Sequence, residues 1–163
     1  MSSLNVARLA SRAVIAVSGP DWRSFLQGLL TQDVETIQPG ELRFAGLLTP
    51  QGKALFDFLI WGDGDDLLID CERDAAGDLA RRLTLYRLRR KVVIAREETL
   101  AVHWSLDATD APPDPRLPAL GHRWIAPPDE GGASAAFRAH RLALGVFEGA
   151  EELGQDQTLW LET

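Results

Sequence analysis

The sequence predicts an α+β domain in which antiparallel strands pack against a few helices. Short runs of β-branched and aromatic residues are separated by tight turns, as antiparallel hairpins require. Two segments among these runs repeat apolar residues at helical spacing. The predicted order over residues 12–104 is β-α-β-β-β-α-β-β, which is a close relative of the ferredoxin-like split motif.

The first strand and the first helix are predicted next to each other. The run RAVIAVSG (12–19) is β-branched and ends at a glycine. Ser18 or Gly19 can cap the helix that follows, and Pro20 suits its first turn. An apolar stripe then predicts a helix of about three turns, because its members are spaced by three or four residues: Trp22, Phe25, Leu26, Leu29 and Leu30.

Three strands joined by turns should come next, followed by a helix and two more strands. The three strands are predicted at 41–48, 52–61 and 67–70, with turns at TPQG and GDGDD. The segment ERDAAGDLARRLTLY has helical spacing. The last two strands are KVVIA (91–95), of a buried type, and TLAVHW (99–104), which alternates.

A change of composition divides the chain into residues 1–105, the α+β domain, and residues 106–163, a proline-rich connection with a partial second subdomain. Four prolines in DATDAPPDPRLP predict an extended surface loop. A strand is predicted at 121–127, and a helix at 133–145 should end at its glycine. The tail carries the apolar residues Leu159, Trp160 and Leu161, and the sequence around them predicts little for these residues to pack on.

Composition excludes several classes of function. The 163 residues carry a net charge of −7, which argues against nucleic acid or an anionic membrane as a partner of the whole chain. No apolar stretch approaches the length of a membrane span, and AVIAV is too short for a signal peptide. A single cysteine, Cys71, and three separated histidines predict no disulfide and no metal site. We expect a cytoplasmic protein.

Asp57 is the first residue that stands out. It lies in GKALFDFLIW, where both faces of the predicted strand are apolar. A buried carboxylate needs a partner. The partner is either a backbone N–H group or an arginine of the same chain, or the paired N–H donors of a bound heterocycle. Asp70, on the next strand, could face the same cavity.

A basic run follows the second predicted helix. It comprises Arg81, Arg82, Arg87, Arg89, Arg90, Lys91 and Arg96. The run is either a solvated helix end, where cations are favourable, or a local site for a carboxylate tail or a phosphate. Tyr86, Arg87 and Arg89 stand where the helix becomes a strand and could point into a cleft. The chain contains no GxGxxG, P-loop or GxSxG motif.

Four segments, in this order, resemble the folate-binding YgfZ family. They are FLQGLLTQDV (25–34), LLTPQGKALFDFLIW (47–61), LTLYRLRRKVVI (83–94), and HRLALGVFEG through LWLET (140–163). That family is related to the glycine-cleavage T protein, and the similarity is closest to its iron–sulfur cluster assembly branch. The resemblance implies a T protein-like folate-binding domain that is incomplete at its C-terminus.

The resemblance also implies a ligand, partners and site residues. The ligand is tetrahydrofolate or a derivative, and the partners are iron–sulfur assembly or client proteins, chiefly of the [4Fe–4S] class. Asp57 would anchor the N–H groups of the pterin, Asp70 and Tyr86 would line the cavity, and Arg87 or Arg89 would meet the glutamate tail or the buried carboxylate. It implies no catalytic residue in this chain.

Two departures from the family pattern bear on activity. The T protein has two adjacent acids in the segment matching GKALFDF, and Phe56 replaces the first of them, which argues against aminomethyl transfer. The K-G-C-[YF]-x-G-Q-E signature of YgfZ-type proteins is missing, so we expect the chain to end before it, and Cys71 does not match its cysteine. Two alternatives remain: a folate-dependent aminomethyltransferase, and a ligand-free module that docks an acidic protein or RNA.

Overall fold

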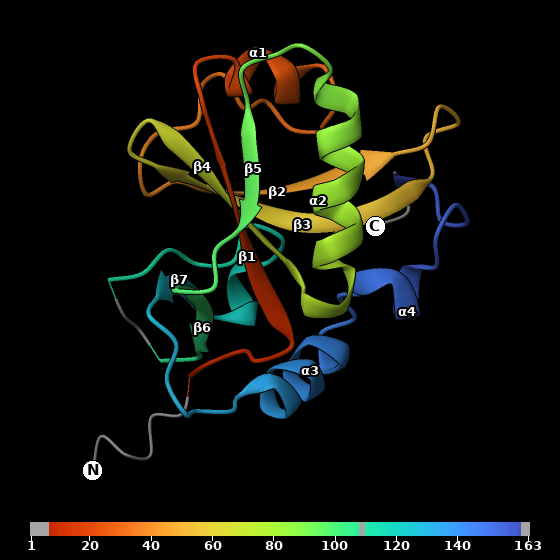
Figure 1. The fold of residues 1–163 in the computed structure, drawn as a ribbon. Helices are drawn as coiled ribbons and strands as arrows, with labels where there is room; N and C mark the ends of the chain where they lie inside the picture. The colour runs from red at the N-terminus through yellow and green to blue at the C-terminus, as the bar shows by residue number, and fades with distance from the viewer. Residues whose placement is uncertain (1–6, 108–109, 161–163) are drawn as a thin grey trace.

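The computed structural model describes residues 7–107 and 110–160. Its centre is a five-stranded sheet with the order β2-β3-β4-β1-β5, and β6 and β7 form a second, two-stranded sheet (Figure 1). The strands are β1 (Arg12–Ser18), β2 (Leu42–Leu48), β3 (Ala54–Asp63), β4 (Asp66–Glu72), β5 (Val93–Arg96), β6 (Ala101–Ser105) and β7 (His122–Ala126). The α-helices are α1 (Trp22–Gln27), α2 (Arg73–Arg87), α3 (Ser134–Ala143) and α4 (Gly149–Leu153), and η2 (Pro118–Leu120) is a 3₁₀ turn.

The topology confirms the predicted α+β class. Strand β1 lies between β4 and β5 and is antiparallel to both, and β3 pairs with the other side of β4. Without the edge strand β2, the order is that of the split βαβ motif. The GDGDD turn joins β3 to β4, with Gly64 at a φ of 60°, which glycine adopts at low cost.

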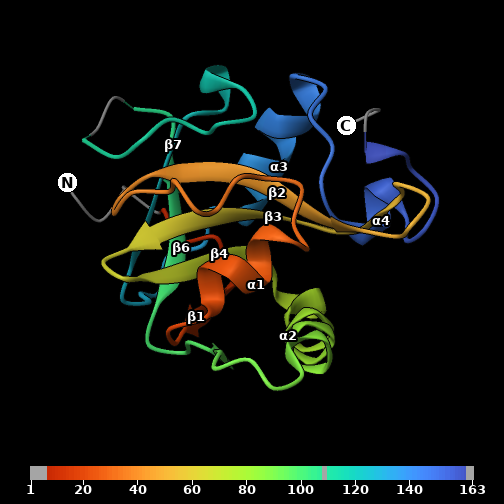
Figure 2. The same ribbon diagram turned by 90° about the horizontal axis from the view of Figure 1, so that it is seen from above.

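The two helices α1 and α2 cover one face of the large sheet (Figure 2). Alternate residues of each strand point to this face, which we call the helix face, and build the larger of two apolar clusters. Strand β3 contributes Phe56, Phe58 and Ile60 to this cluster, and α2 contributes Leu79 and Leu83. Phe56 therefore points towards α2.

The opposite face, which we call the second face, is covered by residues from the C-terminal third of the chain (Figure 2). Leu59 and Trp61 of β3 point to this side and join a second apolar cluster with Trp104 and Phe137. Asp57 and Asp70 share the face, because Leu59 pairs with Asp70 and side chains alternate along β3. The prediction that both faces of β3 are buried is thus confirmed.

Three local predictions differ from the structure. Helix α1 has only six residues, because the chain leaves the helix at Gly28, although Leu30 beyond it is still buried. Strand β5 is exposed rather than buried, since it is an edge strand with β1 as its neighbour in the sheet. The tail does find a surface, because the ring of Trp160 stacks on Phe44 of β2 at 5.0 Å between centroids. Leu161 lies outside the described residues.

Strands β6 and β7 stand on either side of the boundary predicted between residues 105 and 106. They pair with each other from Ala101↔Ala126 to Ser105↔His122. Residues after the boundary therefore complete a sheet that begins before it. Within the part of the chain that the structure describes, no helix is long and apolar enough to cross a membrane.

Candidate functional site

A polar cavity of about 410 Å³ opens between the second face of the sheet and the two C-terminal helices. We call it the sheet–α3 cavity. Its floor comes from β1 and from the junction of β4 with α2, and its roof from α3 and α4. Its charged lining includes Arg12, Glu72, Arg73, Arg138, Arg141 and Glu148, and Phe137 adds an apolar wall.

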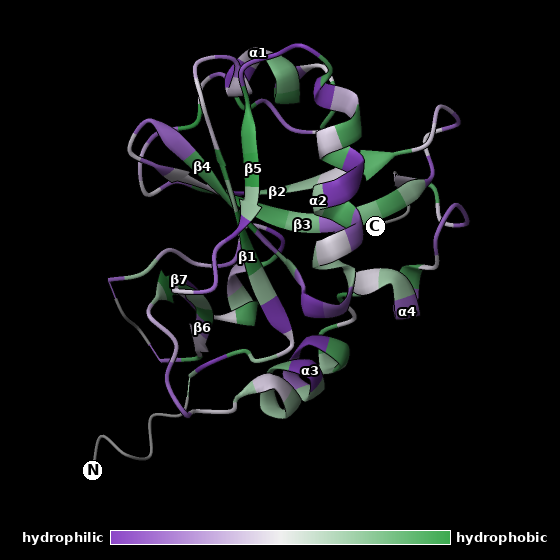
Figure 3. Cartoon of the chain, in the orientation of Figure 1, coloured by the Kyte–Doolittle hydropathy of each residue, from purple (hydrophilic) through white to green (hydrophobic). Residues whose placement is uncertain are grey.

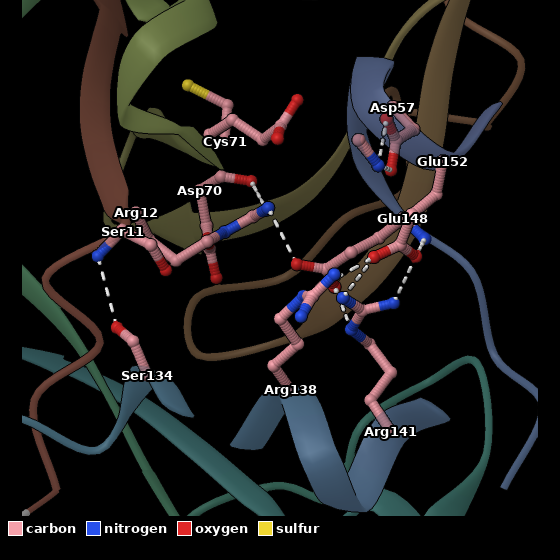
Figure 4. Close-up of polar contacts among 12 residues, drawn as sticks. Ser11, Arg12, Asp57, Asp70, Cys71, Ser134, Arg138, Arg141, Glu148 and Glu152 are labelled. Atoms are coloured by element: carbon pink, nitrogen blue, oxygen red, sulfur yellow. Dashed lines mark hydrogen bonds and ion pairs between the residues drawn. The ribbon is translucent and has the colours of Figure 1, made fainter. Parts of the chain in front are cut away.

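Asp57 lies beside this cavity, under the first turn of α4 (Figure 4). Asp57 is 8% exposed, and both of its carboxylate oxygens accept the backbone N–H of Gly149 at 3.0 Å. Glu72 accepts the next N–H, that of Ala150, at 2.9 Å. Gly149 has a φ of 83°, which favours glycine, and a Cβ there would lie 2.4 Å from a Glu72 oxygen, so the Glu72 carboxylate would have to move. The partner of Asp57 is thus a backbone N–H, one of the two types of partner expected.

Burial raises the pKa of the Asp57 carboxyl above its ordinary value, and Glu148 and Glu72 raise it further. Arg12 and the N–H of Gly149 oppose this shift without cancelling it. Within residues 7–107 and 110–160, no arginine, lysine or histidine forms an ion pair with Asp57. Asp57 is therefore a buried acceptor that lacks a cationic partner in the described chain.

Asp70 is also buried, but it has cationic partners and its pKa is shifted in the opposite direction from that of Asp57. The residue is 0% exposed, and its oxygens accept Arg12 Nε at 2.8 Å and Arg123 Nε at 2.6 Å. Burial alone would raise the pKa of this carboxyl, but Arg123 and Arg12 together lower it below its ordinary value. The carboxylate is fully engaged and does not reach the cavity, so its role is to hold Arg12 in place.

Arg12 links Asp70 to a larger buried network. Its Nη1 donates to Glu148 at 3.2 Å (Figure 4). Glu148 also accepts Arg116 at 2.6 Å. Burial would raise the pKa of Glu148, but the arginines Arg12, Arg116 and Arg123 lower it far below its ordinary range. The network balances four arginines against four acids: Arg12, Arg116, Arg123 and Arg141 with Asp70, Asp114, Glu148 and Glu152.

Most of this network was not predicted from the sequence. Arg116 and Asp114 fall in the proline-rich loop, which reads as solvated surface, yet both are buried in the structure. Arg123 carries the one local signal, an arginine in a short strand, HRWIA, whose neighbours are largely apolar. Such a residue needs a buried acid.

The remaining predicted site residues lie on the helix face of the sheet. Tyr86 lines a separate pocket of about 400 Å³ together with Phe56, Arg82 and Gln155. Arg87 donates to the carbonyl of Val92 at 2.8 Å, and Arg89 is exposed. Neither arginine meets the buried carboxylates, whose partners are Arg12 and Arg123. The five predicted residues are therefore divided between the two faces and do not line one cavity.

Cys71 is buried at 1% exposure, and burial raises the pKa of its thiol to about 12. Cys71 is therefore a small core residue whose thiol is held in its unreactive protonated form. Among the described residues, no group of three or more histidines, cysteines and acids is placed to hold a metal ion.

No family model matches the chain. Several curated proteins are similar to it, among them mitochondrial iron–sulfur cluster assembly factors named IBA57 or IBA57 homologue. The chain is 30% identical to the homologue of Mycosarcoma maydis, over 99% of this chain and 48% of that protein. It is 30% identical to the homologue of Pyricularia oryzae, over 95% and 46%, and 29% identical to the human protein, over 96% and 54%. The chain thus spans about half the length of the curated relatives it matches.

A solved structure with a similar fold is the glycine cleavage system aminomethyltransferase T from Bartonella henselae. The TM-score is 0.54 at 18% identity, over 59% of this chain and 27% of that one. This likeness confirms the predicted T protein-like fold. The prediction of a cytoplasmic location is contradicted, because the relatives are named as mitochondrial. The chain is therefore similar to the IBA57 iron–sulfur cluster assembly factors along nearly its whole length, and it has the fold of the glycine cleavage T protein.

Proposed function

We propose that this chain acts in iron–sulfur cluster assembly or repair, as an accessory protein that binds tetrahydrofolate or a derivative. The observation that carries the first part is the similarity to IBA57 factors over 95–99% of the chain. The fold shared with an aminomethyltransferase of the glycine cleavage system supports the second part. Assembly factors or iron–sulfur client proteins would be the partners.

The sheet–α3 cavity has the chemistry that a reduced folate needs. Its volume of about 410 Å³ lies within the usual range for small-molecule sites, about 300–1,000 Å³. Asp57 is an acceptor without a cationic partner among the described residues, and each of its oxygens keeps a lone pair beyond the bond to Gly149. Arg141 Nε is buried and has no hydrogen-bond partner in the described part of the chain. The residues present therefore fit the ligand.

These residues assign roles in the cavity and next to it. Asp57, which lies beside the cavity and is not among the residues that line it, would accept the N–H groups of the pterin, as the resemblance implies. Arg73 and Arg138 would receive the carboxylates of the glutamate tail, because both line the cavity and guanidinium groups pair well with carboxylates. Asp70 would act through Arg12. Arg87 and Arg89 do not line this cavity, so Arg73 and Arg138 take their place at the tail. Tyr86, which is expected to line the folate cavity, does not line this one.

The test is Asp57→Asn, which keeps the size of the side chain and removes its charge. In the full-length protein, calorimetric titration with 5-formyltetrahydrofolate should show binding that the variant weakens by about tenfold or more. The variant should also restore [4Fe–4S] enzyme activity poorly in cells that lack the gene. Asp63→Asn, at the exposed end of β3, is the matched control and should behave as wild type. Equal folate binding by both variants would remove Asp57 from the site, and failure of the wild-type gene to restore activity would refute the role in assembly.

The aminomethyltransferase alternative is supported by the shared fold. Phe56 is relevant to this alternative. Its side chain is 7% exposed and packs in the apolar cluster of the helix face. An acid at this position would lie on the opposite face of β3 from Asp57. Turnover of aminomethylated lipoyl carrier with tetrahydrofolate would decide in favour of the enzyme.

A further inference from the structure

Exposed apolar side chains gather where α2 ends and β5 begins. Leu85 is 68% exposed, Leu88 84% and Tyr86 42%. We call these three residues the α2–β5 patch. Val93 is also exposed but is not part of the patch, because Val92 and Ile94 pack in the cluster of the helix face and Val93 between them points to the opposite face. Most large apolar side chains in the described chain are buried, so a group of three in one place marks a surface that another molecule can cover. The pocket of about 400 Å³ that contains Leu85 and Tyr86 adds a concave site beside it.

The backbone at Leu88 holds its side chain outward. Leu88 has a φ of 52° and a ψ of −115°, a conformation that favours glycine. Side chains in such conformations are costly and are found most often at functional sites. Here the strained residue is also the most exposed of the large apolar residues that the structure describes.

Cations surround the patch. Residues 79–96 contain seven arginines and lysines and no acid, in a chain whose net charge is −7. Arg81 pairs with Asp78, whereas Arg82, Arg89 and Lys91 form no ion pair within residues 7–107 and 110–160. Figure 3 shows the hydrophilic connection from α2 passing beside the hydrophobic strand β5. The exposed apolar side chains at the end of α2 therefore belong to a segment with several cations that have no ion-pair partner among the described residues.

We propose that the α2–β5 patch docks a protein partner through a segment that carries both acidic and aliphatic side chains. Aliphatic side chains would cover Leu85 and Leu88, and carboxylates would pair with the arginines around them. Strand β5 is an edge strand, so the segment can also bond to its free backbone groups. This inference does not depend on folate binding, since the patch lies on the other side of the sheet from the sheet–α3 cavity.

Two other occupants fit the surface less well. RNA would use the arginines but leave the aliphatic side chains uncovered, with Tyr86 as the one aromatic ring of the patch for stacking. The overall negative charge would also repel it. A second copy joined through the same patch would bring the two basic runs together.

The experiment measures fluorescence anisotropy of a labelled short peptide of alternating Glu and Leu, with the full-length protein. Wild type should bind it, and should bind a Glu and Ser peptide more weakly by about tenfold or more. Leu88→Ser and Arg89→Glu should each weaken binding of the first peptide by about tenfold, while folate binding stays unchanged. Leu106→Ser, at another exposed leucine, and Lys53→Glu, at a cation before β3, are the matched controls.

Four outcomes would overturn the proposal. The first is equal binding of the peptide by wild type and both patch variants, with thermal unfolding showing that all are folded. The second is no binding by wild type. The third is tighter binding of a uridine oligonucleotide than of the peptide, with the same loss in the variants. The fourth is self-association of wild type that the variants abolish, which would make a second copy the occupant.

Discussion

At the scale of single residues, Leu88 is the position where backbone conformation and residue type conflict most. Its φ of 52° with a ψ of −115° costs a residue with a Cβ about 1–3 kcal/mol, and glycine little. Leu88→Gly should therefore raise the free energy of unfolding by about 1 kcal/mol in a urea titration. Leu85→Gly, within α2, should lower it by about the same amount, because glycine weakens a helix interior. A loss of stability in Leu88→Gly would show that the Leu88 side chain packs on its own chain.

At the scale of secondary-structure elements, α4 depends on one glycine at its start. Gly149→Ala would force a Cβ to within 2.4 Å of Glu72 and would strain a φ of 83°, so α4 would be displaced from Asp57. We expect the free energy of unfolding to fall by about 2–3 kcal/mol and folate binding to weaken. Gly154→Ala at the other end, with a φ of 72°, meets only the flexible side chain of Gln157 and should cost about 1 kcal/mol. An equal loss of unfolding free energy in the two variants, measured by urea unfolding, would show that the contact between a Cβ at position 149 and Glu72 has no effect on stability.

At the scale of the whole molecule, the buried charge network ties stability to pH. Asp70 and Glu148 have native pKa values below those of the unfolded chain, about 3.9 and 4.3, so the unfolded state binds more protons near pH 4. The contribution of these two carboxylates to the free energy of unfolding is complete above the unfolded-state pKa values, and it is lost as the pH falls through the native pKa values. Arg123→Met removes one partner of Asp70, should raise its pKa and should move acid unfolding, followed by circular dichroism, to higher pH.

The same substitution tests the energy of the network at neutral pH. Breaking a buried pair should cost about 3–5 kcal/mol, because Asp70 stays buried. Arg43→Met, which breaks a part-exposed pair with Glu41, should cost about 1 kcal/mol or less. Similar costs for the two variants would mean that Arg12 alone satisfies Asp70.

The elements of the fold could be predicted because their signals are local. Alternation along β3, the GDGDD turn and the spacing in α2 each involve residues close together in the chain. The site could be predicted only in part, because its contacts are distant in sequence. Asp57 meets Gly149 across 92 residues, and Asp70 meets Arg123 across 53. The resemblance implies that Tyr86, Arg87 and Arg89 share a site with Asp57, and the linear sequence does not show that α2 covers the other face of the sheet.

The division of the sheet into two faces has a consequence for synthesis of the protein. The elements that cover the helix face, α1 and α2, are complete once residue 87 has been made. Asp57 finds its partner only when residue 149 follows, and Asp70, which can already pair with Arg12, gains its second partner with residue 123. A nascent chain that has reached β5 therefore exposes the Asp57 carboxylate and the apolar residues of the second face before the segments that cover them have been made. During translation this face is the one that chaperones would need to shield.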